Sequence, residues 1–236
     1  MCFTKSMTRP FDLGSPAFST AGGLLQLLRD GHPRTRAELA TLTGLSRPTV
    51  AQRIDQLLEL GLIAPVEAAV STGGRPSSQI AFNPRARVVI AADLGALHAR
   101  IALTDLDGRL LAELSESRDI ADGPDSAIEW ILRSSQQLLA QTGIPVANVA
   151  GIGMGVPGPV EFSTGRPINP PIMPGWDRYD IPAALRAEID APVFVDNDVN
   201  IMALGEQTSS WPGVTDIIFI KVASGIGAGV ISGGRL

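Results

Sequence analysis

The chain has 236 residues, of which 44% are hydrophobic and 18% are charged, so it suits one or two globular domains with an apolar core. No apolar run reaches the ~18 residues of a membrane helix, and the N-terminal residues lack the apolar core of a signal peptide. The single cysteine, Cys2, excludes an internal disulfide, and His32 and His98 have no partners at metal-ligand spacing. We therefore expect a cytoplasmic protein without a metal site.

Basic and acidic residues are distributed unevenly along the chain. Residues 1–86 hold nine Lys or Arg against six Asp or Glu, whereas residues 87–236 hold ten against eighteen. A basic N-terminal part joined to an acidic remainder indicates that the N-terminal part meets a polyanion, such as a nucleic acid.

The N-terminal part has the pattern of a helix-turn-helix. Leucines at helical spacing predict a first helix over residues 18–30. Thr35 and Glu38 are spaced as a capping box that begins a second helix. After a tight glycine turn, Ser46 caps a third helix, which carries an apolar stripe and ends at Gly61. Two short helices around such a turn, the second of them amphipathic, predict a helix-turn-helix.

The exposed start of the third helix carries side chains suited to double-stranded DNA, namely Arg47, Thr49, Gln52 and Arg53. Arginine binds guanine or phosphate, glutamine binds adenine, and threonine contacts a phosphate or a thymine methyl group. The alternative is an ordinary solvated helix face. The preceding turn and caps favour DNA binding by these four residues.

A β-wing is predicted directly after this helix. Two short strand-like runs cover residues 62–66 and 78–82, and Arg75 lies between them, after a glycine pair and before a proline. Such an arginine could enter a narrow minor groove, although a flexible hairpin with one stray arginine is the alternative. We therefore expect residues 15–84 to form a winged helix-turn-helix domain.

From Arg87 onward the pattern changes to that of a mixed α/β fold. Three strands are predicted within residues 88–117, a long helix over 124–142, a strand over 149–156 and a helix over 181–189. A short strand over 193–195 is followed by a helix to about Thr208, and then by two strands over 217–222 and 228–231. Hairpins followed by strand–helix alternation predict a mixed sheet with helices packed on it.

The segment Asp196-Asn197-Asp198 stands between an apolar strand and an amphipathic helix. This is where α/β proteins present acidic side chains to a ligand, at the C-terminal end of a strand. The alternative is that these residues only form a turn and cap the helix.

Four motifs, taken together, resemble the ROK family (repressors, open reading frames and sugar kinases). They are Val-Pro-Gly-Pro-Val at 156–160, Pro-Pro-Ile-Met-Pro-Gly-Trp at 170–176, the segment 196–206, and Ser-Gly-Ile-Gly-Ala-Gly at 224–229. The resemblance covers about residues 15–236, because winged-helix heads joined to ROK bodies form the repressor branch. It implies an α/β chain in which residues 87–236 are the N-terminal portion of an actin-like, hexokinase-like ATPase domain.

The resemblance also implies residue roles. In ROK kinases the aspartate matching Asp198 is the base for a sugar hydroxyl, and the asparagine matching Asn197 holds the sugar. Glu206 belongs to the same sugar-binding group. The first phosphate loop would hold Asp93 and Gly95, and the second would hold Ser224, Gly225 and Gly227.

This chain departs from the kinase pattern in two of these places. Ala96 and Leu97 replace the second glycine and the threonine of the first phosphate loop. Ile172 stands where sugar kinases carry an asparagine. We therefore expect Asp198 to be a vestigial base and the chain not to be an enzyme.

The resulting expectation is a homodimeric repressor of carbohydrate-related genes that binds a pseudo-palindromic operator and responds to a sugar or phosphosugar. The alternatives are an ATP-dependent sugar kinase and a fragment that binds DNA but no sugar. Relatives continue past the second phosphate loop into a segment with a structural zinc site, whereas this sequence stops at Leu236. We expect a C-terminally truncated chain without a cofactor.

Overall fold

The computed structural model describes residues 20–66, 78–223 and 225–236. The predictions for Arg75 and Ser224 therefore lie outside the described residues, as does the start of the predicted first helix. The chain divides into two compact units, Met1–Arg87 and Val88–Leu236, which are called the head and the body below. The predicted domain limits of 15–84 and 87–236 stay predictions. In the described ranges, no helix combines the length and the apolar character that crossing a membrane requires.

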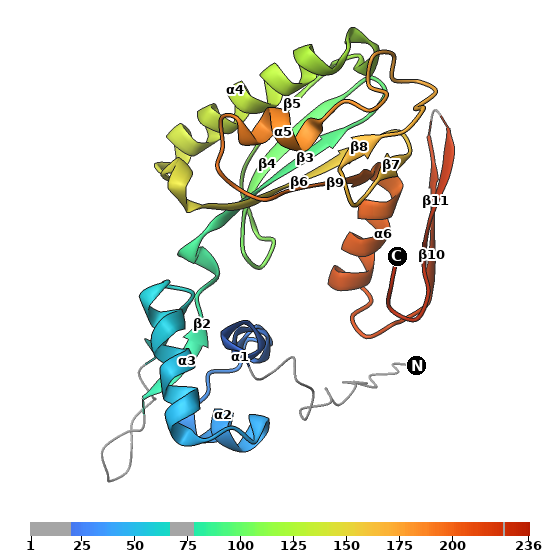
Figure 1. Cartoon of the computed structure of the whole chain (residues 1–236). Helices are drawn as coiled ribbons and strands as arrows, with labels where there is room; N and C mark the ends of the chain where they lie inside the picture. Colours follow the sequence, from blue (N-terminus) through green and yellow to red (C-terminus); the bar gives the residue numbers. More distant parts are fainter. Residues whose placement is uncertain (1–19, 67–77, 224) are drawn as a thin grey trace, which may run out of the picture. The chain divides into compact units, whose positions relative to one another are not determined.

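The described residues of the head form three helices and a two-stranded antiparallel sheet (Figure 1). The elements are α1 (Ala21–Leu28), α2 (Arg36–Thr43), α3 (Arg47–Glu59), β1 (Ile63–Val66) and β2 (Gln79–Phe82), followed by the 3₁₀ turn η2 (Pro84–Ala86). Aliphatic side chains from all three helices and both strands meet in one core, in which Leu24, Leu39 and Ile54 are fully buried. The predicted helix-turn-helix with two following strands is confirmed.

Capping residues set where the helices of the head begin. The Thr35 hydroxyl accepts a hydrogen bond from the Glu38 N–H at 3.2 Å, and the Glu38 carboxylate accepts one from the Thr35 N–H at 2.7 Å. This reciprocal pair confirms the predicted capping box of α2. The Ser46 hydroxyl accepts from the Thr49 N–H at 3.3 Å and begins α3. Between the two helices Gly44 has a φ of 68°, a left-handed conformation that favours glycine.

The body is built on a five-stranded sheet in the order β5-β4-β3-β6-β9 (Figure 1). Its strands are β3 (Val88–Leu94), β4 (Ala99–Asp105), β5 (Leu110–Glu116), β6 (Val149–Val156) and β9 (Val193–Asn197). The first three form an antiparallel meander, and β6 and β9 add to it in parallel. The mixed sheet expected from the sequence is therefore present, and its parallel half ends at the predicted polar segment.

Helices cover the sheet and close a single apolar core. These helices are α4 (Pro124–Thr142), α5 (Ile181–Arg186) and α6 (Asp198–Ser209). The connecting segments contain the 3₁₀ turns η3 (Ile120–Asp122) and η4 (Val146–Asn148) and the short strands β7 (Val160–Glu161) and β8 (Arg166–Pro167). Helix α4 packs on β4 and β5, and α5 packs on β9. Trp176 is fully buried in the core, and its indole N–H donates to the Ile120 carbonyl at 3.1 Å. That buried hydrogen bond anchors the long loop between β8 and α5.

Three predicted boundaries of the body differ from the structure by two residues or more. Strand β9 does not stop at Val195 but continues through Asn197, because its pairing with β6 extends to Val156. Strand β11 begins at Ile226 and not at 228, since Ile226 pairs with Val222 across the hairpin. Helix α5 ends at Arg186, three residues before the predicted end.

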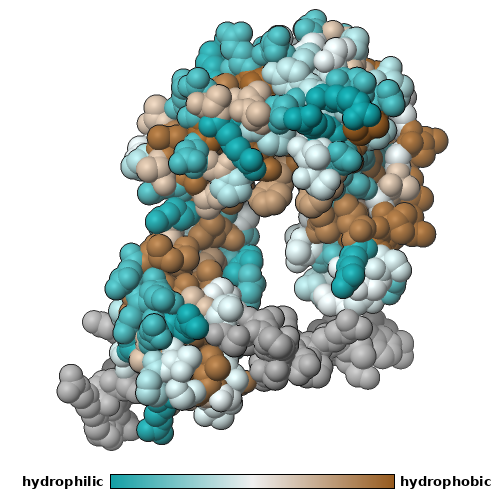
Figure 2. Space-filling view, viewed as in Figure 1, coloured by the Kyte–Doolittle hydropathy of each residue, from teal (hydrophilic) through white to brown (hydrophobic). Residues whose placement is uncertain are grey.

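The last two strands, β10 (Ile217–Val222) and β11 (Ile226–Ile231), form a separate antiparallel hairpin that packs on α6. One face of the hairpin lies so close to α6 that a Cβ at Gly229 would stand 2.7 Å from both the Ala203 Cβ and the Val199 carbonyl oxygen. The other face is apolar and exposed, with Ile218 paired opposite Val230. Figure 2 shows hydrophobic side chains gathered over this hairpin.

Candidate functional site

Helix α3 carries the four side chains predicted to contact DNA, of which Arg47 and Gln52 are exposed and Thr49 and Arg53 are half-buried. Thr49, Gln52 and Arg53 are spaced at i, i+3 and i+4, so they share one side of the helix, whereas Arg47 is the first residue of α3 and lies on another side of its first turn. The opposite side is buried, with Val50 and Ile54 fully enclosed in the core. The fold of the head therefore turns this polar face outward, as a recognition helix requires.

Of the two arginines of α3, Arg47 is exposed and Arg53 is half-buried. Among the described residues, neither Arg47 nor Arg53 takes part in an ion pair, and the Arg53 Nε atom is buried without a hydrogen-bond partner. By contrast, Arg34 is paired with Asp30, and Arg36 is paired with Asp55 at 3.1 Å. Unpaired guanidinium groups on an exposed helix face can bind phosphate or guanine without first losing an internal partner.

The wing strands are present, but the minor-groove arginine is not among the described residues. Strands β1 and β2 pair antiparallel from Ile63 opposite Phe82 to Val66 opposite Gln79. Arg34 extends this sheet through main-chain hydrogen bonds with Ile80 at 2.8 and 2.9 Å. The role of Arg75 stays a prediction.

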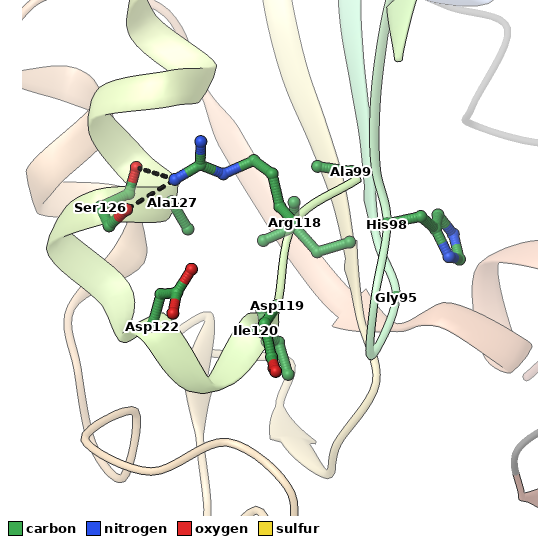
Figure 3. A pocket seen from close by; sticks show the side chains of 10 residues that line it. Gly95, His98, Ala99, Arg118, Asp119, Ile120, Asp122, Ser126 and Ala127 are labelled. Atoms are coloured by element: carbon green, nitrogen blue, oxygen red, sulfur yellow. Dashed lines mark hydrogen bonds between the residues drawn. The ribbon is translucent and has the colours of Figure 1, made fainter. Parts of the chain in front are cut away.

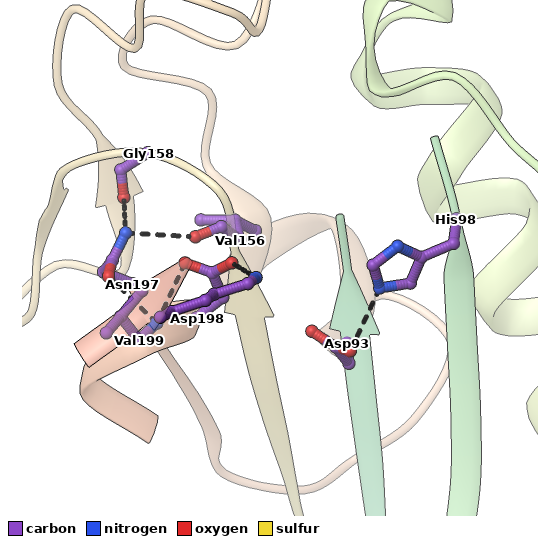
Figure 4. A network of polar contacts seen from close by, with 8 residues as sticks. Asp93, His98, Val156, Gly158, Asn197, Asp198 and Val199 are labelled. Atoms are coloured by element: carbon purple, nitrogen blue, oxygen red, sulfur yellow. Dashed lines mark hydrogen bonds and ion pairs between the residues drawn. The ribbon is translucent and has the colours of Figure 1, made fainter. Parts of the chain in front are cut away.

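The body contains a cleft of about 320 Å³ that brings together three segments predicted from the sequence. It is lined by the first loop at Gly95, by Asn197 and Asp198 at the junction of β9 and α6, and by Gly225 and Gly227 of the second loop. Its volume lies at the lower end of the range of small-molecule sites. Figure 4 shows the polar network along this cleft.

The junction of β9 and α6 forms the polar floor of the cleft. The Asn197 side chain caps α6 by accepting from the Val199 N–H at 3.0 Å, and its amide donates to the Gly158 carbonyl at 3.1 Å. Asp198 is buried, and Lys221 donates to its Oδ2 at 2.5 Å while the Val199 N–H donates to its Oδ1 at 2.9 Å. Both carboxylate oxygens of Asp198 therefore have partners inside the protein.

Capping does not explain all of this segment. The cap is Asn197, and Asp198 already belongs to α6. Asp196 is also buried, and its Oδ1 accepts from the Asn200 amide at 2.9 Å and from the Asn197 N–H at 2.6 Å. Capping therefore accounts for Asn197, whereas Asp198 is paired with a cation that lies on another element and lines the cleft.

In the first loop, between β3 and β4, the side chain of His98 packs over the backbone of Gly95. The Gly95 N–H donates to the His98 carbonyl at 2.8 Å, which closes a tight turn between β3 and β4. A Cβ at Gly95 would lie 2.0 Å from the His98 Cε1 atom, so the imidazole covers the face of this glycine. The ring is held there by Asp93, whose carboxylate lies 3.3 Å from the His98 Nε2 atom (Figure 4). A phosphate could approach the Gly95 backbone only after this ring had moved.

Lys221 and His98 were not found as site residues by sequence reasoning. Lys221 is the one charged residue in the run Ile-Ile-Phe-Ile-Lys-Val of β10, and a lone lysine in an apolar strand is a signal that could have been used. Glu206 was predicted to bind sugar, but it lies about two turns further along α6 than Asp198 and does not line the cleft. Its carboxylate accepts from the Trp211 indole N–H at 3.2 Å.

A second, much smaller cavity lies on the other side of the His98 turn, next to Arg118 (Figure 3). Its volume is about 10 Å³, which is room for about one water molecule. Arg118 donates to the Ser126 hydroxyl at 2.5 Å and to its carbonyl at 3.3 Å, and so ties the end of β5 to α4. This contact stabilises the fold and forms no ligand site. In the ranges that the structure describes, no group of three metal-ligating side chains occurs either.

Comparison with known proteins supports both units. A family model described as "Winged helix-turn-helix DNA-binding" matches residues 23–64, and the ROK family model matches residues 89–236. A solved structure of a ROK family transcriptional regulator, a homologue of the E. coli MLC protein, superposes with a TM-score of 0.76 at 22% identity over 91% of this chain and 54% of that one. A ROK hexokinase from Thermus thermophilus covers 63% of this chain and 48% of its own at 29% identity and a TM-score of 0.54.

Curated relatives align with nearly the whole chain. The xylose repressor of Bacillus subtilis is 26% identical over 90% of this chain and 55% of its own length. The DNA-binding transcriptional dual regulator NagC of Escherichia coli is 28% identical over 92% of this chain and 53% of its own length. The chain thus spans about half the length of the curated relatives it matches. Because the family model matches more than half of its residues, the chain belongs to the ROK family.

Proposed function

We propose that this chain is a sequence-specific DNA-binding transcriptional regulator, a repressor of carbohydrate-related genes whose body binds a sugar or sugar derivative. The observation that carries the proposal is the joining of a winged helix-turn-helix head, with unpaired arginines on α3, to a ROK body with a polar cleft. Relatives with the same combination are named as xylose and N-acetylglucosamine repressors. Such a function is exerted in the cytoplasm, where bacterial relatives meet their DNA.

In this proposal two heads bind a pseudo-palindromic operator as a homodimer. Each α3 would lie in a major groove, with Arg47 and Arg53 reaching bases or phosphates and Gln52 reaching a base edge. Arg75 would contact the minor groove from the wing. Binding of the effector at Asn197 and Asp198 would change the affinity for the operator, which is a coupling between two sites.

The test is operator binding by single arginine variants. Arg47→Ala or Arg53→Ala should weaken binding by about 1–3 kcal/mol and relax one base position if the contact is to a base. If the contact is to a phosphate, binding should weaken on all sequences and the salt slope should fall by about one. Arg133→Ala, which removes an exposed arginine from α4 of the body, is the control for loss of charge alone. Unchanged binding in both head variants would contradict the proposed role of α3.

A sugar kinase is the second candidate, because Asp198 and the glycines of the second loop line the same cleft. Two contacts argue against it. His98 covers Gly95 in the first phosphate loop, and Lys221 holds the carboxylate that would accept the hydroxyl proton. A coupled assay for ADP over a panel of sugars decides between the two, and turnover that disappears in Asp198→Asn would establish the kinase.

A further inference from the structure

The cleft of the body has a polar floor and an apolar rim. Asn197, Asp198 and Lys221 form the floor. The rim is formed by Leu97, Ile172 and Ile226, whose exposed fractions are 65%, 48% and 81%. These three residues come from the turn between β3 and β4, from the loop after β8, and from the start of β11.

The three apolar side chains around one cleft indicate a ligand that has an apolar part. Single exposed aliphatic residues are ordinary on a protein surface, but here three segments far apart in the sequence each place one at the mouth of the same cavity. Burial of each side chain against a ligand would be favourable, because it removes apolar surface from water. An unsubstituted sugar carries hydroxyl groups around its ring, and packing those hydroxyls against aliphatic side chains removes their water without replacing the hydrogen bonds.

The floor of the cleft favours polar groups of a ligand. The carboxylate of Asp198 and the side-chain oxygen of Asn197 keep lone pairs that can accept from hydroxyl groups, and the Lys221 ammonium beside them has further N–H groups to donate. A ligand that satisfies both parts needs a hydroxylated end and an apolar end. Binding sites for small molecules commonly combine an apolar lining with a few convergent polar groups in this way.

We propose that the ligand of this cleft is a glycoside or similar amphipathic sugar derivative, whose sugar hydroxyls reach Asp198 and Asn197 and whose apolar group packs on Leu97, Ile172 and Ile226. This inference rests on the proposed function, in which the cleft binds a sugar-type effector. It goes further by naming the class of effector and the residues that select it.

The experiment compares matched pairs of ligands on the whole chain. Binding of methyl and phenyl β-glycosides of xylose, glucose and N-acetylglucosamine is measured by calorimetry. In at least one pair the phenyl glycoside should bind about tenfold more tightly, because the phenyl group buries apolar surface that the methyl group cannot reach. Asp198→Asn should weaken both members of that pair.

Substitutions at the rim of the cleft test whether the preference for the phenyl glycoside arises there. Ile172→Ser and Leu97→Ser should each lower the ratio of phenyl to methyl glycoside affinity several-fold. Ile218→Ser is the matched control, because Ile218 is 70% exposed on β10 but does not line the cleft. A preference that persists in both rim variants would overturn the assignment.

The two proposals fail in different ways. Equal affinity for methyl and phenyl glycosides, lost in Asp198→Asn, would overturn the amphipathic ligand and leave the sugar-responsive regulator standing. Operator binding without affinity for any glycoside would overturn the sugar effector itself, and the amphipathic ligand with it.

Discussion

Replacing Gly229 by alanine tests how the cleft is held together. Gly229 lies in β11, and its φ is not in the left-handed region, so alanine adds only its methyl group. That Cβ would stand 2.7 Å from the Ala203 Cβ, 2.7 Å from the Val199 carbonyl oxygen and 3.3 Å from the Val199 carbonyl carbon. Two of these three atoms belong to helical backbone, which cannot rotate away as the end of a flexible side chain can. The hairpin and α6 must therefore separate.

Overpacking of this kind typically lowers the free energy of unfolding by about 1–3 kcal/mol. For a unit the size of the body, this lowers the midpoint of thermal unfolding by roughly 2–12 °C. Intrinsic fluorescence reports this transition specifically, because Trp130, Trp176 and Trp211 are the only tryptophans of the chain and all lie in the body. Because the hairpin carries Lys221, the Gly229→Ala chain should also bind effector less tightly.

Gly205→Ala is the control, because its added Cβ would meet no atom within 4 Å on the exposed side of α6. This substitution should raise stability by about 0.5–1 kcal/mol through the helix propensity of alanine. Equal midpoints for Gly229→Ala and the unchanged chain would refute the close approach of β11 to α6. A fall of equal size in both glycine variants would show that the contacts of Gly229 are not the cause.

Three further predictions concern single contacts. Thr35→Ala removes the capping box of α2 and should cost the head about 1 kcal/mol, visible as faster amide hydrogen exchange in α2 with no change in α4. The Arg34 guanidinium lowers the pKa of Asp30 from 3.8 to about 2, so the pair stabilises the head above pH 4 and loses that effect as the pH falls toward 2. Because the Asp30 side chain is 43% exposed, Asp30→Asn should cost under ~1 kcal/mol at pH 7, and the difference from the unchanged chain in a pH series of unfolding should vanish near pH 2. Lys221→Met leaves the buried Asp198 without its cation and should destabilise the body by several kcal/mol in denaturant unfolding, whereas a loss below ~0.5 kcal/mol would contradict the ion pair.

The head could be predicted almost entirely from the sequence, because its signals are local. A capping box, a left-handed glycine and a serine cap each act within four residues, and the leucine spacing identifies the face that enters the core. In the described part of the head the structure differs from the prediction at the ends of elements, as in α1, which ends at Leu28 and not at residue 30. The sequence does not show that Arg53 is half-buried or that Arg47 and Arg53 have no ion-pair partner among the described residues.

The site of the body could be predicted only in part, because its contacts join distant residues. The strand–acid–helix junction at Asn197 and Asp198 was visible in the sequence, but the partner of Asp198 is Lys221, which lies 23 residues further on. The extension of β9 to Asn197 depends on pairing with β6, which no local pattern reveals. His98 looked like an isolated histidine until the tight turn placed it over Gly95.

The proposal that the head binds a specific operator as a dimer can be tested directly. Genomic fragments bound by the purified chain can be selected, and affinity for the recovered site measured over a salt series. We expect an inverted repeat with half-sites about one DNA turn apart, and a log affinity that falls linearly with log salt by about 0.9 for each phosphate contacted. No binding at low salt, or binding with a salt slope but without sequence preference, would contradict it.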